Sequence, residues 1–177
     1  VESLGEIVMY VGQELIKVDQ LQMLFQQLIV VLEGREKRVQ ERNARCNTED
    51  FDEDEKDLIE AENETEDEIF EAVVECVGNV LKAYGAKAHT FVDMMLPGIS
   101  QLLGSNRSTE EQRIGVCLFD DLIEFSNQDG AAVRYMEPFL PFVWNASVSK
   151  DFTLRQAAVY GIGVCAQNAT DAFRPHA

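Results

Sequence analysis

The stretch Ser108–Phe125, STEEQRIGVCLFDDLIEF, decides the fold that we predict for this chain. Ser108 and Glu111 have the spacing of a capping box, in which each side chain bonds the backbone N–H of the other residue at a helix start. The apolar residues that follow recur every three or four positions, as on one face of an α-helix. They are Ile114, Cys117, Leu118, Leu122 and Phe125. The stretch therefore predicts a capped amphipathic helix.

The same periodicity recurs on both sides of this stretch. We expect further helices over residues 3–16 and 20–44, from Thr65 to Tyr84, and around the apolar residues of 91–103, 135–144 and 154–165. Thr90 and Asp151 are the expected caps of the helices that follow them. Because about seven helical patterns occur and no stretch alternates as a strand does, the sequence predicts an all-α protein.

Two of the predicted hairpins resemble each other. Each has a Leu-Pro in its first helix, Leu96-Pro97 or Leu140-Pro141, and an arginine near the start of its second. The two arginines, Arg113 and Arg155, are 42 positions apart. A period near forty with two helices per unit indicates a HEAT-type α-solenoid. We expect residues 1–177 to form one HEAT-repeat segment of a larger solenoid, with antiparallel helix pairs stacked in a right-handed superhelix.

An acidic tract, Glu49–Glu71, holds fourteen acidic residues and one base, Lys56, and so carries most of the formal net charge of −17. Because like charges repel, we expect residues 46–64 to be a flexible insertion within one repeat. Removing 49–64 should then leave the helix content nearly unchanged. A capping box at Thr65–Glu68 would start the next helix. The tract either binds a basic partner or is only a solvated loop; the candidate binding residues are Asp52, Glu53, Asp54, Glu55 and Asp57.

The pI near 4.4 argues against direct nucleic-acid binding and favours a basic protein partner. No apolar run is long enough for membrane insertion. The spacing of Cys46, Cys76, Cys117 and Cys165 indicates reduced thiols, mostly in the core, in a cytosolic or nuclear protein. A basic run before the acidic tract favours charge balance at a helix end over a separate basic site. It comprises Arg35, Lys37, Arg38, Arg42 and Arg45.

Few residues in the sequence are candidates for a binding or catalytic site. Gly161-Ile162-Gly163-Val164-Cys165-Ala166 fits a loose dinucleotide pattern, but no strand precedes it, so close helix packing is the favoured interpretation. Asp120, Asp121 and Glu124 share a helix face and suit a patch for lysine and arginine. A plain solvated face is the alternative. No motif points to a catalytic residue, a cofactor or a metal. Met94, Met95 and Trp144 have core spacing.

Three motifs carry a resemblance to a known family. RIGVCLFDDLIEF (113–125), FLPFVWNAS (139–147) and LRQAAVYGIGVCAQNA (154–169) resemble the importin beta-3 type of nuclear import receptor, within the importin-beta (karyopherin) family. The match is best over residues 67–177, and residues 1–45 match loosely.

The resemblance implies an interior segment of a non-catalytic receptor that shuttles between cytoplasm and nucleus. Such receptors bind basic cargo proteins with nuclear localisation signals, phenylalanine-glycine nucleoporins and the GTPase Ran, which releases the cargo. The second helices of the family's repeats line the concave face, so Asp120, Asp121 and Glu124 would face the channel. A static HEAT-repeat scaffold subunit of another complex is the alternative function.

Overall fold

The computed structural model describes residues 2–47, 51–125 and 130–176. Helices make up most of these residues, and none of them is in a strand. The helices are α1 (Glu2–Leu15), α2 (Val18–Arg45), α3 (Glu53–Tyr84), α4 (His89–Leu102), α5 (Thr109–Phe125), α6 (Ala131–Ala146), α7 (Phe152–Asn168) and α8 (Thr170–Phe173). Short 3-10 turns span Gly85–Ala88 and Arg174–His176. The all-α prediction is confirmed.

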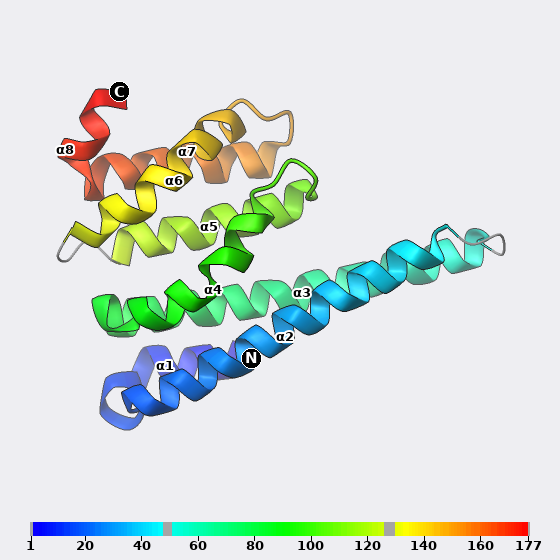
Figure 1. Cartoon of the computed structure of the whole chain (residues 1–177), viewed down its shortest axis with the longest axis horizontal. Coiled ribbons are helices and arrows are strands. Elements are labelled where there is room, and N and C mark those ends of the chain that lie inside the picture. Colours follow the sequence, from blue (N-terminus) through cyan, green and yellow to red (C-terminus); the bar gives the residue numbers. More distant parts are fainter. Residues whose placement is uncertain (1, 48–50, 126–129, 177) are drawn as a thin grey trace.

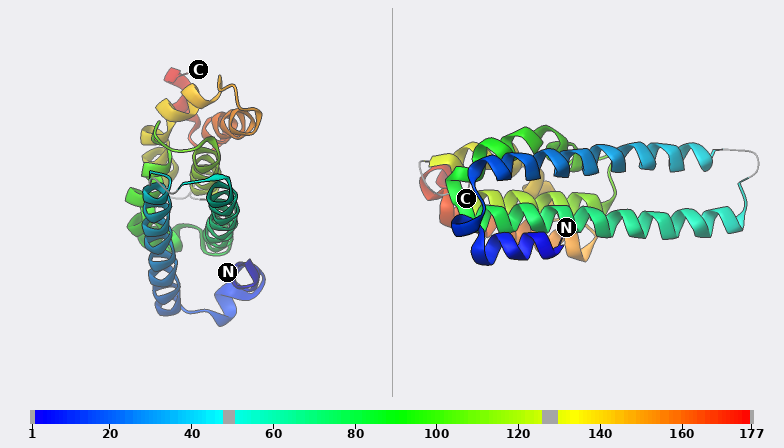
Figure 2. Two further views of the ribbon diagram at one scale, coloured as in Figure 1. Left: turned by 90° about the vertical axis from the view of Figure 1, so that its right-hand side faces the viewer. Right: turned by 90° about the horizontal axis from the view of Figure 1, so that it is seen from below.

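The helices form two layers that run the length of the stack (Figures 1 and 2). One layer holds α1, α3, α5 and α7, each packed on the next, and the other holds α2, α4 and α6. The chain alternates between the layers, so α2/α3, α4/α5 and α6/α7 are successive helical hairpins. This is the arrangement of a HEAT-type solenoid, as the period near forty residues predicts.

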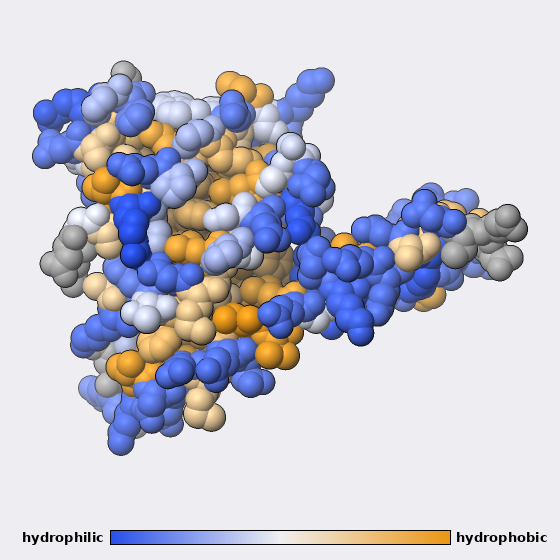
Figure 3. Space-filling view, in the orientation of Figure 1, coloured by the Kyte–Doolittle hydropathy of each residue, from blue (hydrophilic) through white to orange (hydrophobic). Residues whose placement is uncertain are grey.

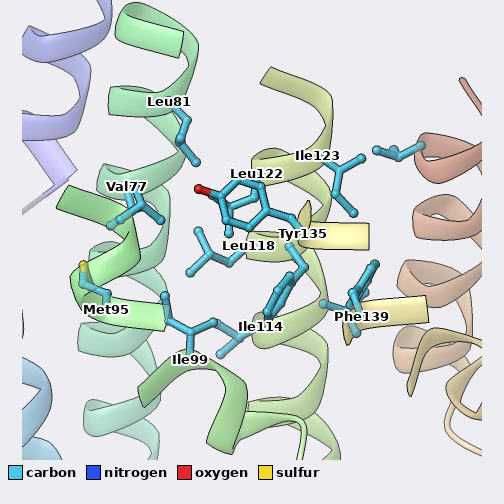
Figure 4. Close-up of a cluster of buried hydrophobic side chains, with 14 of the residues drawn as sticks. Val77, Leu81, Met95, Ile99, Ile114, Leu118, Leu122, Ile123, Tyr135 and Phe139 are labelled. Carbon is cyan, nitrogen blue, oxygen red and sulfur yellow. The ribbon is translucent and has the colours of Figure 1, made fainter. Parts of the chain in front are cut away.

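One continuous core lies between the layers (Figure 4). In α5, Ile114, Leu118 and Leu122 are buried against neighbouring helices. Phe119 of α5 stacks on Phe139 of α6, with ring centroids 5.0 Å apart. Because each hairpin buries its apolar face only against its neighbours, stability spreads along the stack.

Two of the contacts between adjacent repeats join residues 42 positions apart. Glu71 of α3 pairs with Arg113 of α5, and the hydroxyl of Tyr135 on α6 donates to Asp93 on α4 over 2.8 Å. Each pair joins equivalent helices of successive repeats. The first pair lies in the layer of α3 and α5, and the second lies in the layer of α4 and α6. The separation in these two contacts equals the repeat length read from Arg113 and Arg155.

Of the four predicted caps, those at Ser108 and Asp151 are confirmed, and those at Thr90 and Thr65 are wrong. The amide of Glu111 donates to Ser108 Oγ, and the amide of Ser108 donates to the Glu111 carboxylate, both over 3.1 Å. Asp151 accepts from the amide of Leu154 over 2.9 Å. Thr90 caps nothing, because α4 begins one residue earlier and follows directly from the 3-10 turn after Tyr84.

The start of α3 corrects the prediction for the acidic tract. The helix begins at Glu53, capped by Asp52, which accepts from the amide of Glu55 over 2.9 Å. Thr65 lies inside the helix and donates its hydroxyl to the carbonyl of Ala61, so the expected capping box is absent there. Residues 53–64 are helical, and their removal would lower the helix content. Of the expected insertion, residues 48–50 lie outside the described part.

Arginines of α2 explain why this acidic helix forms. Arg38 binds both carboxylate oxygens of Glu66, at 2.5 and 3.0 Å. Arg45, two helical turns further out, bonds Glu55 at 2.7 Å and Glu62 at 2.8 Å. These bonds supply the opposite charge that the acidic tract lacks within itself. The basic run therefore balances the acidic tract, as the sequence favours, but it does so by direct pairing across two helices.

The paired ends of α2 and α3 project from the body of the solenoid (Figure 1). We call residues 36–45 of α2 with 53–66 of α3 the arm. Its surface is mostly hydrophilic, with small apolar patches (Figure 3). At its root, Arg35 is only 6% exposed and bridges Asp67 of α3, at 3.1 Å, and Glu111 of α5, at 3.0 Å. The root thus ties the arm to the next repeat.

Candidate functional site: an acidic pocket between α5 and α7

The three predicted acidic residues of α5 lie together near its C-terminal end, but their environments differ. Asp120 is 3% exposed and is directed at α7, where its Oδ1 lies against Gly161. Asp121 is half-buried and is directed at α3, where its carboxylate lies against Gly78. Glu124 is partly exposed and accepts a hydrogen bond from the hydroxyl of Tyr160 over 3.0 Å. The group is a partly buried cluster and not an open surface patch.

A pocket of about 510 Å³ opens beside this cluster. Asp120 and Asp121 line it from α5, and Thr153, Gln156 and Tyr160 line it from α7. Arg113 lies in the same pocket, but its guanidinium is paired with Glu110 and Glu71. The pocket therefore offers carboxylates, a hydroxyl, an amide and a phenol ring to a ligand.

The negative charge of this pocket is poorly compensated. Burial, with smaller contributions from the nearby carboxylates of Asp121 and Glu124, raises the pKa of Asp120 to about 8. Burial also raises the pKa of Asp121, although the ammonium of Lys82 on α3 opposes the rise. Oδ1 of Asp120 finds no hydrogen-bond partner within the described part of the chain. A buried carboxylate without a partner is costly, and a cation would relieve that cost.

The glycine-rich stretch of α7 has the structural role that the sequence favours. Gly161 lies inside the helix and is buried, and a Cβ atom there would overlap the side chain of Asp120. A Cβ atom built on Gly163, in contrast, would meet open space. Gly161 therefore lets α7 approach α5 closely, and the dinucleotide interpretation has no strand or helix start to support it.

The acidic candidates of the arm form a second, separate group. Asp52 caps α3, Glu55 is held by Arg45, and Glu53 contacts Lys56 at 3.4 Å. Asp54 and Asp57 are exposed. Figure 1 places the outer end of the arm far from the C-terminal end of α5, so the structure does not bring the two predicted groups together.

A ridge of exposed acidic side chains runs along the outer face of α3, and sequence reasoning missed it. Its members recur every three or four residues and are all exposed: Glu53, Asp57, Glu60, Glu64 and Glu68. We call these five residues the acidic ridge. The signal was present as helical spacing, but the expected helix start at Thr65 concealed it.

The described residues contain no group of three or more histidine, cysteine and acidic side chains arranged for a metal. All four cysteines are free; Cys76 and Cys165 are buried, and burial raises the pKa of their thiols to about 11 and about 12. Met95 is in the core as expected, whereas Met94 and Trp144 are exposed. No helix in the described ranges is long and apolar enough to cross a membrane.

The stacked hairpins and the pocket between their second helices define a helical-repeat solenoid with an acidic pocket between two of its repeats. Comparison with known families identifies the family. The family model described as importin repeat 6 matches residues 1–105, more than half of the chain. The chain therefore belongs to the importin-beta family of HEAT-repeat proteins. This match covers the N-terminal part, where the sequence motifs were weakest.

Two curated relatives agree with the family. A probable importin-5 homolog of Dictyostelium discoideum is 31% identical over 128 residues, which are 72% of this chain and 12% of that protein. Importin subunit beta-3 of Saccharomyces cerevisiae is 26% identical over 171 residues, which are 97% of this chain and 15% of that protein. The chain thus spans a small part of the length of the relatives that it matches.

Proposed function

We propose that this chain is a segment of a nuclear transport receptor that binds basic protein segments through its acidic surfaces and has no catalytic role. The observation that carries the proposal is the acidic pocket beside Asp120 and Asp121, where Oδ1 of the buried Asp120 has no hydrogen-bond partner among the described residues. A lysine- or arginine-rich segment would place positive charge beside these carboxyl groups. Membership of the importin family gives this binding a role in transport.

The arm extends the same proposal. The acidic ridge and the neighbouring Asp54 are exposed on α3. Clustered charge of one sign attracts an oppositely charged partner from a distance and raises the rate of encounter. In this proposal the arm attracts the basic segment, and the pocket between α5 and α7 holds it.

Cargo release by Ran loaded with GTP, contact with phenylalanine-glycine nucleoporins and shuttling between cytoplasm and nucleus complete the proposal for the whole receptor. They rest on the family to which the chain belongs. The family also weighs against the alternative, a static HEAT-repeat scaffold, which would share the fold and use the acidic arm only as a spacer.

The test uses the intact receptor and a basic cargo protein in size-exclusion chromatography. The receptor should co-elute with the cargo, and adding Ran loaded with GTP should move the cargo to its own elution volume. Ran loaded with GDP is the matched control and should leave the complex intact. A complex that persists unchanged with Ran-GTP would indicate the static scaffold instead.

A further inference from the structure

Helix α5 packs against each of its neighbours, α3 and α7, through a carboxyl group that lies on a glycine. A Cβ atom at Gly78 of α3 would overlap the carboxyl of Asp121, and one at Gly161 of α7 would overlap that of Asp120. Both glycines are buried, and Asp120 is 3% exposed. The carboxyl of Asp120 is therefore enclosed in the junction between the two helices.

The junction one repeat earlier in the same layer has the same form but carries no charge. Asn79 of α3 stands 42 positions before Asp121 and is 6% exposed. It lies against Gly5 of α1, where a Cβ atom would come within 3.1 Å of its Nδ2. An amide is neutral at every ordinary pH, whereas a carboxyl gains or loses a proton. Of these three glycine contacts, the two at α5 can therefore titrate, and the one between α1 and α3 cannot.

The surroundings of Asp120 favour its neutral form. Burial is the main cause, the carboxylates of Asp121 and Glu124 add to it, and the pKa of Asp120 rises to about 8. Burial also raises the pKa of Asp121, and the ammonium of Lys82 on α3 opposes that rise. The other groups around the two carboxyls are Cys117 and Arg113 on α5, Tyr160 and Cys165 on α7, and the apolar Val143 on α6. As the pH rises toward 8, a negative charge therefore forms inside the junction of α5 with α7.

We propose that α5 is a proton-controlled joint of the solenoid, in which α7 closes on a neutral Asp120 and moves away from an ionised one. A buried charge without a partner is costly, and separation of the helices lets water reach it. Oδ1 of Asp120 has no partner within the described residues, so no bond in the closed junction offsets that cost. The closed joint is thus favoured most at low pH and loosens as the pH rises toward 8.

The movement changes the relation between two successive repeats, α4/α5 and α6/α7. In a solenoid the curvature is the sum of small rotations from one repeat to the next, so one joint alters the shape of the whole receptor. Packed helices change their relation by small sliding or hinge movements of this kind. The joint goes beyond the proposed function, because it acts without a partner and does not depend on which partner the receptor binds.

Hydrogen exchange of the intact receptor without a partner tests the joint, because the protection of backbone amides reports local opening. After correction for the intrinsic exchange rate, the protection of the amides around Gly161 should fall by about tenfold or more between pH 6 and pH 8. The amides around Gly5, at the neutral junction, are the internal control and should keep their protection. In Asp120→Asn, the protection around Gly161 should no longer depend on pH.

The reverse change, Asn79→Asp, places a carboxyl at the junction of α3 with α1 and should make the protection around Gly5 fall with rising pH. An equal fall around Gly5 and Gly161 in the unchanged receptor would overturn the joint, because it would show a general loosening. A fall around Gly161 that persists in Asp120→Asn would overturn it too. If either variant does not fold, the comparison of the two junctions in the unchanged receptor still decides.

Discussion

Oδ1 of Asp120 on α5 lies directly against Gly161 on α7, where a Cβ atom would overlap it. The contact joins the second helices of two successive repeats, and it buries a carboxylate that has no bonded partner at Oδ1 among the described residues. Helix packing and the acidic pocket therefore depend on the same pair of residues.

Substitution of the two glycines of α7 tests this contact. Gly161→Ala should lower the free energy of unfolding by about 1–3 kcal/mol, because the new methyl group overpacks the interface. Gly163→Ala should instead raise it by about 0.5–1 kcal/mol, because the position is open and alanine favours the helix. Urea unfolding measures both. Equal effects of the two changes would contradict the close approach.

The pKa of Asp120 predicts a pH dependence of stability. Its value of about 8 in the folded protein lies above the ordinary value of about 4, so between these pH values the folded state holds a proton that the unfolded state has lost. This contribution to stability is therefore greatest at low pH and falls as the pH rises toward 8. Asp120→Asn should gain stability relative to the unchanged protein between pH 5 and pH 8. A difference that does not change with pH would contradict the raised pKa.

The arm should depend on its buried root more than on its exposed pairs. Arg35→Met leaves Asp67 and Glu111 without their shared cation, and we expect a loss of about 3 kcal/mol in the free energy of unfolding. Lys37→Met removes an exposed pair with Glu41 and should change it by less than about 0.5 kcal/mol. Thermal unfolding compares the two variants, and similar losses would show that the root has no special role.

The start of α3 can be tested by a substitution at Thr65, with Ser108, the cap of α5, as the reference. Ser108→Ala should cost about 1 kcal/mol, because it removes a real cap. Thr65→Ala should be neutral or slightly stabilising, because Thr65 lies inside a helix, where alanine is the better residue. A cost near 1 kcal/mol at Thr65 would restore the shorter helix that the sequence alone predicts.

Much of the fold can be predicted from local signals. The capping pairs at Ser108 and Asp151 and the apolar spacing of each helix act within a few residues, so the sequence shows them directly. The start of α3 could not be found in this way. It depends on Arg38 and Glu66, which are 28 positions apart and meet only when α2 and α3 pack together.

The acidic residues of the candidate site were predicted from the sequence, but the burial of Asp120 was not. The shared face of Asp120, Asp121 and Glu124 follows from helical spacing. The burial of Asp120 does not, because it depends on how closely α7 approaches, and that depends on Gly161 in the next repeat. The acidic ridge of the arm was missed because self-repulsion was weighed without the arginines of α2 that oppose it.

The salt dependence of basic-peptide binding by the intact receptor tests the central claim most directly. If the acidic surfaces bind lysine and arginine, the affinity should fall by about tenfold or more between low salt and about 0.5 M salt, since salt screens exposed charges. Neutralising the acidic ridge with Glu60→Gln and Glu64→Gln should reduce that dependence. An affinity that stays the same from low to high salt would contradict the claim.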